Sequence, residues 1–214
     1  MAREECLERK RVGIVIFDYV EVLDFCGPFE VFTVTRINDE KRLEEPSPFE
    51  ALLIAEKDGP VTTAGGMKVI PHYTFNTCPK LDILVVPGGW GTRREINNQV
   101  MLDWLSKQAL EVETLTSVCT GSMLLGFAGL LDGRKATTHW RSLDWMRESF
   151  PSVTVLYDQH VIEDGTVITS AGISAGIDMA LRVVARYHGE EIARFTAKYM
   201  EYPYPEDNKR RIQF

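Results

Sequence analysis

The chain has 214 residues, of which 44% are hydrophobic and 26% charged, proportions that are ordinary for a globular protein and exclude a disordered chain. This length suits one domain with a well-buried core and is short for two. The net charge of −7 offers no broad positive field to a phosphate backbone or an anionic lipid surface, so nucleic-acid and membrane partners are disfavoured.

Strand-like and helix-like segments alternate along the chain, a pattern typical of a parallel sheet covered by helices on both faces. The predicted strands are residues 11–17, 49–56, 81–86, 112–118, 136–138 and 153–157. The predicted helices are residues 28–35, 98–110, 120–131, 141–150, 174–188 and 191–202. Residues 61–75, interrupted by glycine, are predicted to form a hairpin or an excursion from the sheet, and residues 161–170, also interrupted by glycine, are predicted to form a hairpin. We therefore expect an α/β fold, a three-layer sandwich with a mostly parallel, flavodoxin-like central sheet.

No internal repeat or low-complexity linker divides the chain, which predicts a single domain over residues 11–202. Residues 1–10 are predicted to form a charged N-terminal extension, and residues 203–214 a C-terminal tail. The basic cluster at 209–211 stands beside acidic residues, so we interpret it as part of a solvated tail and not as a binding arm.

The cysteine pattern and the N-terminus predict the compartment. The four cysteines are Cys6, Cys26, Cys78 and Cys119. They contain no C-x-x-C pair and no spacing typical of a metal site, so they read as free thiols of a reducing compartment. The charged start of the chain lacks the apolar core of a secretion signal, and no uninterrupted apolar stretch predicts a membrane span. The predicted location is the cytoplasm.

Cys119 stands between the predicted strand 112–118 and the predicted helix 120–131. A thiol at a helix N-terminus lies near unpaired N–H groups and the positive end of the helix dipole, so we expect a pKa well below about 8.5. Gly121 and Ser122 are expected to keep the first turn open to a ligand. The alternative is a buried structural cysteine.

Ligands of open α/β sheets bind beyond the carboxyl ends of the parallel strands. Four polar or glycine-rich segments are predicted there, namely residues 24–28, 88–91, 119–121 and 137–140. Gly88 and Gly89 suit a backbone that points N–H groups at developing negative charge, or else a simple tight turn. Asp24 is either a functional carboxylate or a helix cap. His139 is either a satisfied polar residue or a base that pairs with Cys119.

Taken together, these segments resemble the ThiJ/PfpI superfamily, with its class I glutamine amidotransferase-like fold. The matching segments are residues 21–32, 86–91, 117–122, 136–140 and 171–178. Their Leu-Asp-x-x-Gly-Pro, Cys-Thr-Gly-Ser and Ala-Thr-Thr-His-Trp patterns are most similar to isocyanide (isonitrile) hydratases. Many other members carry Glu where Asp24 stands, and the protease-like branch carries His where Thr120 stands. Both departures argue against peptidase or glutaminase chemistry.

The resemblance implies a role for each site residue. Cys119 would attack the terminal carbon of an isocyanide and form a covalent thioimidate, which water converts to an N-substituted formamide. Asp24 would supply a proton, which requires a raised pKa and a titration coupled to that of the thiol. Thr120 would position Asp24 or the substrate. No metal or organic cofactor is expected.

The resemblance also implies the rest of the pocket and the assembly. The residues expected to bind the substrate or its developing charge are Gly88, Gly89, Trp90, Gly121, His139, Trp140 and Ile173. The expected substrate is an apolar isocyanide, and the expected assembly is a homodimer.

Three other functions remain open. A similar domain stands at the front of AraC-type regulators, where it senses a ligand; the end of this chain at Phe214 favours a free-standing enzyme. A glyoxalase-like or hydrolase activity would use the same thiol. A redox sensor would exploit a low-pKa, exposed thiol.

Overall fold

A seven-stranded sheet forms the centre of the computed structural model, which describes residues 9–212. Its strands lie in the order β10-β11-β7-β6-β1-β2-β5, and every neighbouring pair is parallel except β10 with β11. The strands are β1 (Lys10–Val15), β2 (Phe49–Ala55), β5 (Tyr73–Thr74), β6 (Ile83–Val86), β7 (Thr114–Val118), β10 (Val161–Asp164) and β11 (Val167–Ser170). The expected mostly parallel sheet is confirmed.

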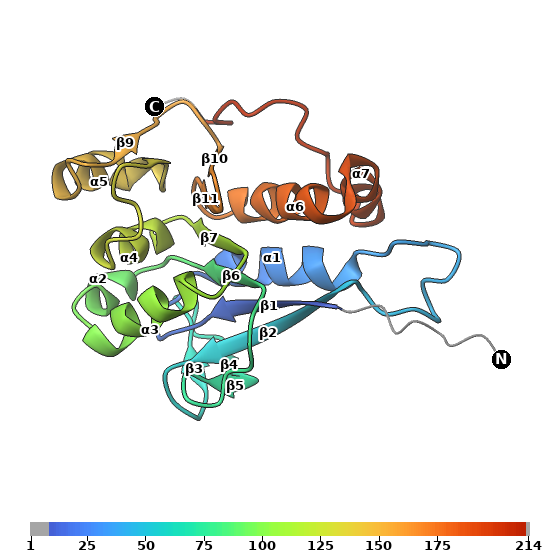
Figure 1. Cartoon of the computed structure of the whole chain (residues 1–214), viewed down its shortest axis with the longest axis horizontal. Coiled ribbons are helices and arrows are strands. Elements are labelled where there is room, and N and C mark those ends of the chain that lie inside the picture. The colour runs from blue at the N-terminus through green and yellow to red at the C-terminus, as the bar shows by residue number, and fades with distance from the viewer. Residues whose placement is uncertain (1–8, 213–214) are drawn as a thin grey trace.

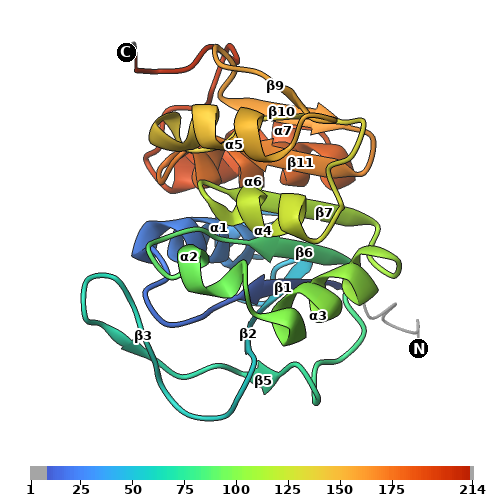
Figure 2. The same cartoon turned by 90° about the vertical axis from the view of Figure 1, so that its left-hand side faces the viewer.

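Helices cover both faces of this sheet (Figure 1). Helices α1 (Val22–Val34), α6 (Ala175–His188) and α7 (Glu190–Tyr199) pack together on one face. Helices α2 (Thr92–Glu95), α3 (Gln99–Ala109) and α4 (Gly121–Phe127) lie on the other, nearer to the viewer in Figure 2. The result is the expected three-layer α/β sandwich. Among the described residues, no helix is long and apolar enough to cross a membrane.

The core lies where the two helical layers meet the central strands. Every residue of β6 and of β7 is buried, as expected for parallel strands covered on both faces. Because β6 and β7 pair in parallel, the loops that follow them leave the sheet side by side. This arrangement brings Gly88 and Cys119 to the same edge.

Helix α1 differs from its prediction, because it begins at Val22 and holds Pro28 in its interior. A proline there removes one helical hydrogen bond, and for that reason the sequence favoured Pro28 as a helix start. Packing compensates: Pro28 is buried, and a Cβ on Gly176 of α6 would contact its ring. The earlier start places Asp24 in the first turn of α1.

Smaller elements also depart from expectation. The predicted strands at 136–138 and 153–157 shorten to β8 (Lys135–Ala136) and β9 (Thr154–Val155), which pair in a separate two-stranded sheet. The predicted helix 141–150 becomes a 3-10 turn η1 (Trp140–Ser142) followed by α5 (Leu143–Ser149). The predicted excursion 61–75 contains the hairpin β3 (Val61–Thr62) and β4 (Lys68–Val69), and β5 joins the main sheet.

The C-terminal segment packs against the domain. Arg210 donates from Nε to the Tyr157 carbonyl at 2.8 Å and from its guanidinium to Thr137 Oγ1 at 2.6 Å. Arg211 forms an ion pair with the buried Asp178 at 2.8 Å. The interpretation of this basic cluster as a solvated tail is therefore wrong for Arg210 and Arg211. Residues 1–8 of the predicted N-terminal extension, including Cys6, lie outside the described residues.

Candidate active site

A cavity of about 200 Å³ opens at the carboxyl edge of the parallel strands, with Cys119 in its wall. Its described lining residues are Glu21, Gly89, Trp90, Arg93, Cys119, Thr120, His139, Arg141, Ser142 and Ile173. Six of the predicted site residues are in this set. The cavity joins side chains from the loops after β6 and β7, from α1's N-terminus and from η1, so segments far apart in sequence form one site.

Cys119 occupies a sharp turn between β7 and α4. Its φ of 56° lies in the left-handed region, which L residues adopt only when the surroundings hold them there. The Cys119 N–H donates to the Ala171 carbonyl at 3.0 Å. The Cys119 carbonyl accepts from Thr138 Oγ1 at 2.9 Å and from Ser122 Oγ at 3.0 Å. These bonds fix the backbone that carries the thiol.

Asp24 is fully buried beside this turn. Its Oδ2 accepts from the Gly88 N–H at 2.9 Å, whereas Oδ1 has no hydrogen-bond partner among the described groups. The N-cap of α1 is Glu21, without a side-chain cap, so the alternative of Asp24 as a helix cap is wrong. A buried carboxyl oxygen without a partner is costly when ionised, which favours the protonated form.

The carboxyl of Asp24 and the thiol of Cys119 compete for a proton. Burial raises the pKa of Asp24 to about 7, although the Gly88 N–H lowers it. Burial, and then the Asp24 carboxylate, raise the pKa of Cys119 well above its ordinary value, against the N–H groups of Thr120 and Ile173. The expected rise at Asp24 is confirmed. The expected low pKa of Cys119 is wrong, because burial outweighs the helix N-terminus.

The glycines of the predicted site contact other groups of the protein, namely Gly88, Gly89 and Gly121. The Gly88 N–H is used by Asp24, and the Gly89 N–H donates to Thr120 Oγ1 at 3.1 Å. A Cβ on Gly121 would overlap the Val86 carbonyl, so this glycine allows α4 to pack on β6 and does not line the cavity. These contacts position Asp24, Thr120 and the helix, which differs from the expected presentation of free N–H groups to a substrate.

Thr120 is held by a small network. Its Oγ1 accepts from Thr92 Oγ1 at 3.1 Å as well as from Gly89, and both its N–H and its hydroxyl lower the pKa of Cys119. Thr92 is fully buried and also donates to the Gly89 carbonyl at 2.7 Å. The sequence analysis missed Thr92, since α2 is too short to give a helical pattern; its place directly after the glycine-rich turn was the available signal.

His139 and Trp140 lie to one side of the thiol. His139 Nδ1 accepts from the Arg141 N–H at 3.3 Å, and burial followed by the charges of Arg141 and Arg210 lowers the pKa of His139. No hydrogen bond joins His139 to Cys119 among the described residues, so the carboxyl of Asp24 is the proton partner that the geometry favours. Trp140 lines a neighbouring cavity and not that of Cys119.

Ile173 and Trp90 form apolar parts of the wall. Ile173 has a φ of 54°, rare for a β-branched residue, and its N–H lowers the pKa of both Asp24 and Cys119. The strained backbone thus places an N–H beside both Asp24 and Cys119. Trp90 is 66% exposed and lies at the open side of the cavity.

The charged residues Glu21, Arg93 and Arg141 were not predicted from the sequence, although they also line the cavity. Nothing in the local sequence around these three residues distinguishes them from solvated surface charges. Cys26, Cys78 and Cys119 are free. Within residues 9–212, no group of three or more Cys, His, Asp or Glu side chains is arranged to hold a metal ion.

Comparison with known proteins gives concordant results. Residues 10–186 match the model of the DJ-1/PfpI family. The chain is 35% identical over 193 residues to the isonitrile hydratase of Pseudomonas putida, covering 90% of this chain and 78% of that protein. It is 38% identical over 141 residues to the HTH-type transcriptional regulator CdhR of Pseudomonas aeruginosa, covering 66% of this chain and 41% of the regulator.

A solved structure is similar over nearly the whole chain. The crystal structure of a ThiJ/PfpI family protein from Pseudomonas syringae superposes with a TM-score of 0.79 and 30% identity, covering 94% of this chain and 78% of that one.

Proposed function

Because the chain belongs to the DJ-1/PfpI family, we propose that it hydrates an isocyanide to an N-substituted formamide, with Cys119 as nucleophile and Asp24 as proton donor. One observation carries the proposal: a fully buried carboxyl with a pKa near 7 stands beside a thiol on a fixed, strained turn. The similarity to an isonitrile hydratase supports the substrate class.

The first step uses the pair after it has lost one proton. In the resting pair the thiol holds the remaining proton, because its pKa is the higher of the two; the reactive form arises when this proton moves to Asp24 and the N–H groups of Thr120 and Ile173 stabilise the Cys119 thiolate. Asp24 gives this proton to the terminal isocyanide carbon, which carries a lone pair, and the sulfur attacks the same carbon. A C–S bond forms, and the product is the thioimidate R–N=CH–S–Cys119, with Asp24 left as a carboxylate.

The second step adds water and releases the enzyme. Water attacks the thioimidate carbon while Asp24 accepts a water proton and passes it to the nitrogen. The C–S bond of the resulting tetrahedral adduct then breaks, and the hydroxyl proton returns to Asp24 as the carbonyl forms. The sum is R–NC plus water giving R–NH–CHO, with the starting state of the pair restored.

This cycle explains the surrounding contacts. Gly88 holds one oxygen of Asp24 and leaves the other free, so the same carboxyl oxygen can serve each transfer. Thr120 supports the thiolate through its N–H and hydroxyl. Trp90 and Ile173 supply apolar wall for the substituent, and His139 and Trp140 remain less direct neighbours of the reaction.

The test is incubation with an aryl isocyanide, with chromatography and mass spectrometry of the product. We expect the formamide, its loss in Cys119→Ala, and a fall in kcat/KM of at least about 100-fold in Asp24→Asn, the lower range for a lost general acid. Cys78→Ala is the matched control, since Cys78 is a free cysteine outside the cavity. Formamide production at the wild-type rate by Cys119→Ala would refute the covalent mechanism.

The competing functions give different outcomes in the same experiment. Conversion of methylglyoxal without formamide would favour a glyoxalase-like enzyme. Saturable ligand binding without turnover would favour a sensing domain, to which the similarity with an HTH-type regulator points. A redox sensor is disfavoured because Cys119 is 6% exposed with a raised pKa, opposite to the exposed low-pKa thiols that oxidise readily. The homodimer stays a prediction.

A further inference from the structure

Two arginines line the Cys119 cavity without a polar partner. The guanidinium groups of Arg93 and Arg141 make no hydrogen bond and no ion pair among the described residues, although both belong to the cavity wall. Every other described arginine side chain donates to a carbonyl, a hydroxyl or a carboxylate. These partnered side chains are Arg9, Arg11, Arg36, Arg42, Arg94, Arg134, Arg147, Arg182, Arg186, Arg194, Arg210 and Arg211. The two unpaired guanidiniums therefore occur together, at the candidate active site.

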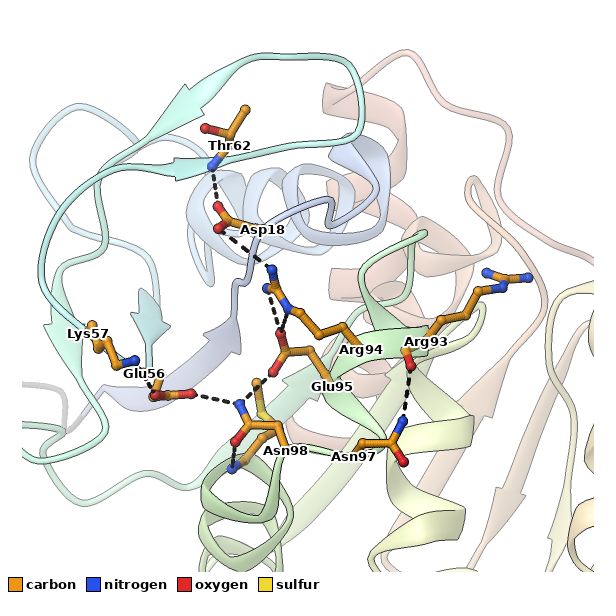
Figure 3. A network of polar contacts seen from close by, with 10 residues as sticks. Asp18, Glu56, Lys57, Thr62, Arg93, Arg94, Glu95, Asn97 and Asn98 are labelled. Atoms are coloured by element: carbon orange, nitrogen blue, oxygen red, sulfur yellow. Dashed lines mark hydrogen bonds and ion pairs between the residues drawn. The ribbon is translucent and has the colours of Figure 1, made fainter.

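The neighbouring Arg94 shows the contrast directly. Arg94 donates to Glu95 Oε1 at 2.6 Å and lies 3.9 Å from Asp18. In Figure 3 its side chain turns into the network around Asp18, Glu95 and Asn98, whereas Arg93 extends away from that network. Consecutive residues of α2 thus send one guanidinium to carboxylates of the protein and the other to the cavity.

Aromatic rings orient both free guanidiniums. Arg93 stacks over Trp90 at 4.6 Å from the ring centroid, and Arg141 over Trp140 at 4.8 Å. Stacking uses the face of the planar group and leaves its N–H edge for a planar anion such as a carboxylate. Held in this way, the side chains lose less conformational freedom when they bind.

Three charged side chains line the cavity with Cys119, namely Glu21, Arg93 and Arg141. The two guanidiniums outnumber the single carboxylate, so these three side chains together favour an anion. Because the arginines and Cys119 line the same cavity of about 200 Å³, an anion bound by the guanidiniums would sit a few atoms from the sulfur.

We propose that the substrate carries a carboxylate a few atoms from its reacting carbon, and that Arg93 and Arg141 bind this carboxylate. The inference rests on the proposed function for the isocyano group, and it replaces a purely apolar isocyanide by an anionic one. The anion site itself depends only on the positions of the two arginines relative to Cys119.

The first test measures the anion site without any hydratase activity. Iodoacetate and iodoacetamide alkylate a thiol by the same step: the sulfur forms a bond to carbon and iodide leaves. Alkylation of Cys119 is followed by peptide mass spectrometry, and the iodoacetate-to-iodoacetamide rate ratio is compared between variants. We expect this ratio to fall about fivefold in Arg93→Gln and in Arg141→Gln, the upper range for an exposed ion pair.

Arg94→Gln is the matched control, because Arg94 is adjacent in sequence but pairs with Glu95 away from the cavity. Its ratio is expected to equal that of the wild type. An unchanged ratio in both Arg93→Gln and Arg141→Gln overturns the proposal. Using a ratio cancels any general change in the reactivity of Cys119.

The second test compares the isocyanoacetate anion with isocyanoacetamide as substrates. We expect kcat/KM to favour the anion in the wild type and the preference to fall about fivefold in each arginine variant. If neither compound yields a formamide while the alkylation ratio still depends on the arginines, the proposed function fails and the anion site stands. Formamide formation without preference, together with an insensitive alkylation ratio, refutes the anion site alone.

Discussion

Replacement of Asp24 by asparagine separates the cost of burying this carboxyl from every other pH effect. Asp24 binds its proton more tightly in the folded chain, because burial raises its pKa from 3.8 to about 7. A carboxyl whose pKa is raised by folding stabilises the folded chain at low pH. This stabilisation is lost as the pH rises from the pKa of the group in the unfolded chain to its pKa in the folded chain. The asparagine is neutral throughout and has nearly the same shape.

The size of the effect follows from the two pKa values. Moving an ionisation from pKa 3.8 to about 7 corresponds to about 4 kcal/mol of folding free energy. The free energy of unfolding of Asp24→Asn, relative to the wild type, should therefore rise by about 4 kcal/mol between pH 4 and pH 8. For a chain of this size that difference is a relative gain in Tm of about 10 °C.

The assay is denaturant unfolding of both proteins at pH 4, 5, 6, 7 and 8. Asp103→Asn is the control, since Asp103 is exposed on α3 and its removal should give curves parallel to the wild type. Parallel curves for Asp24→Asn as well would show that Asp24 is ionised at no cost in the folded state. The reasoning that makes this carboxyl a proton donor would then fail.

Three further substitutions test the framework of the site. Thr138→Val removes the hydrogen bond to the Cys119 carbonyl and should lower the free energy of unfolding by about 1 kcal/mol, measured by urea denaturation, and slow iodoacetamide alkylation of Cys119. Gly121→Ala forces a methyl group onto the Val86 carbonyl; we expect a loss of about 2 kcal/mol or more, and an unchanged Tm would contradict the packing. Asp178→Ala removes a buried carboxylate that contacts the buried His160, pairs with the exposed Arg211 and accepts a hydrogen bond from Tyr202; we expect a loss of about 1–3 kcal/mol, with thermal unfolding as the readout.

Helices and strands were predicted correctly where the local sequence pattern favours the same structure as the packing of the whole domain. The amphipathic segment at 98–110 became α3 with Asn98 as its cap, and the glycine-interrupted segment 161–170 became the hairpin β10–β11. The start of α1 was not predicted, because proline is favoured at the first turn of a helix and Pro28 was therefore placed there. In the structure Pro28 lies in the interior of α1, where it packs against α6. Pairing of β8 with β9 outside the main sheet depends on contacts that no local pattern contains.

The candidate site could be predicted from the sequence where a cysteine occupies a recognisable junction between a strand and a helix. Cys119 follows a buried strand and precedes a helix, and the resemblance supplied Asp24 as its partner. The direction of the thiol's pKa was not predictable, because it depends on how deeply both groups are buried. Arg93 and Arg141 were missed for a different reason: what distinguishes them is the absence of a partner, which appears only when every arginine's surroundings are known.

The raised pKa of Cys119 gives the proposed enzyme a way to couple its reactivity to its substrate. A thiol kept protonated by burial and by the Asp24 carboxylate is a poor nucleophile towards ordinary electrophiles. An isocyanide differs because its carbon accepts the proton that Asp24 holds, and the carbon becomes electrophilic through that transfer. The charge of Asp24 raises the pKa of Cys119, but Asp24 is neutral in the form of the pair that reacts. It becomes a carboxylate only as the sulfur forms its bond to carbon. Cys119 would then react fastest with a substrate that accepts a proton at the attacked carbon, whereas an ordinary alkylating agent should react measurably but slowly with Cys119 at pH 7 compared with an exposed free thiol.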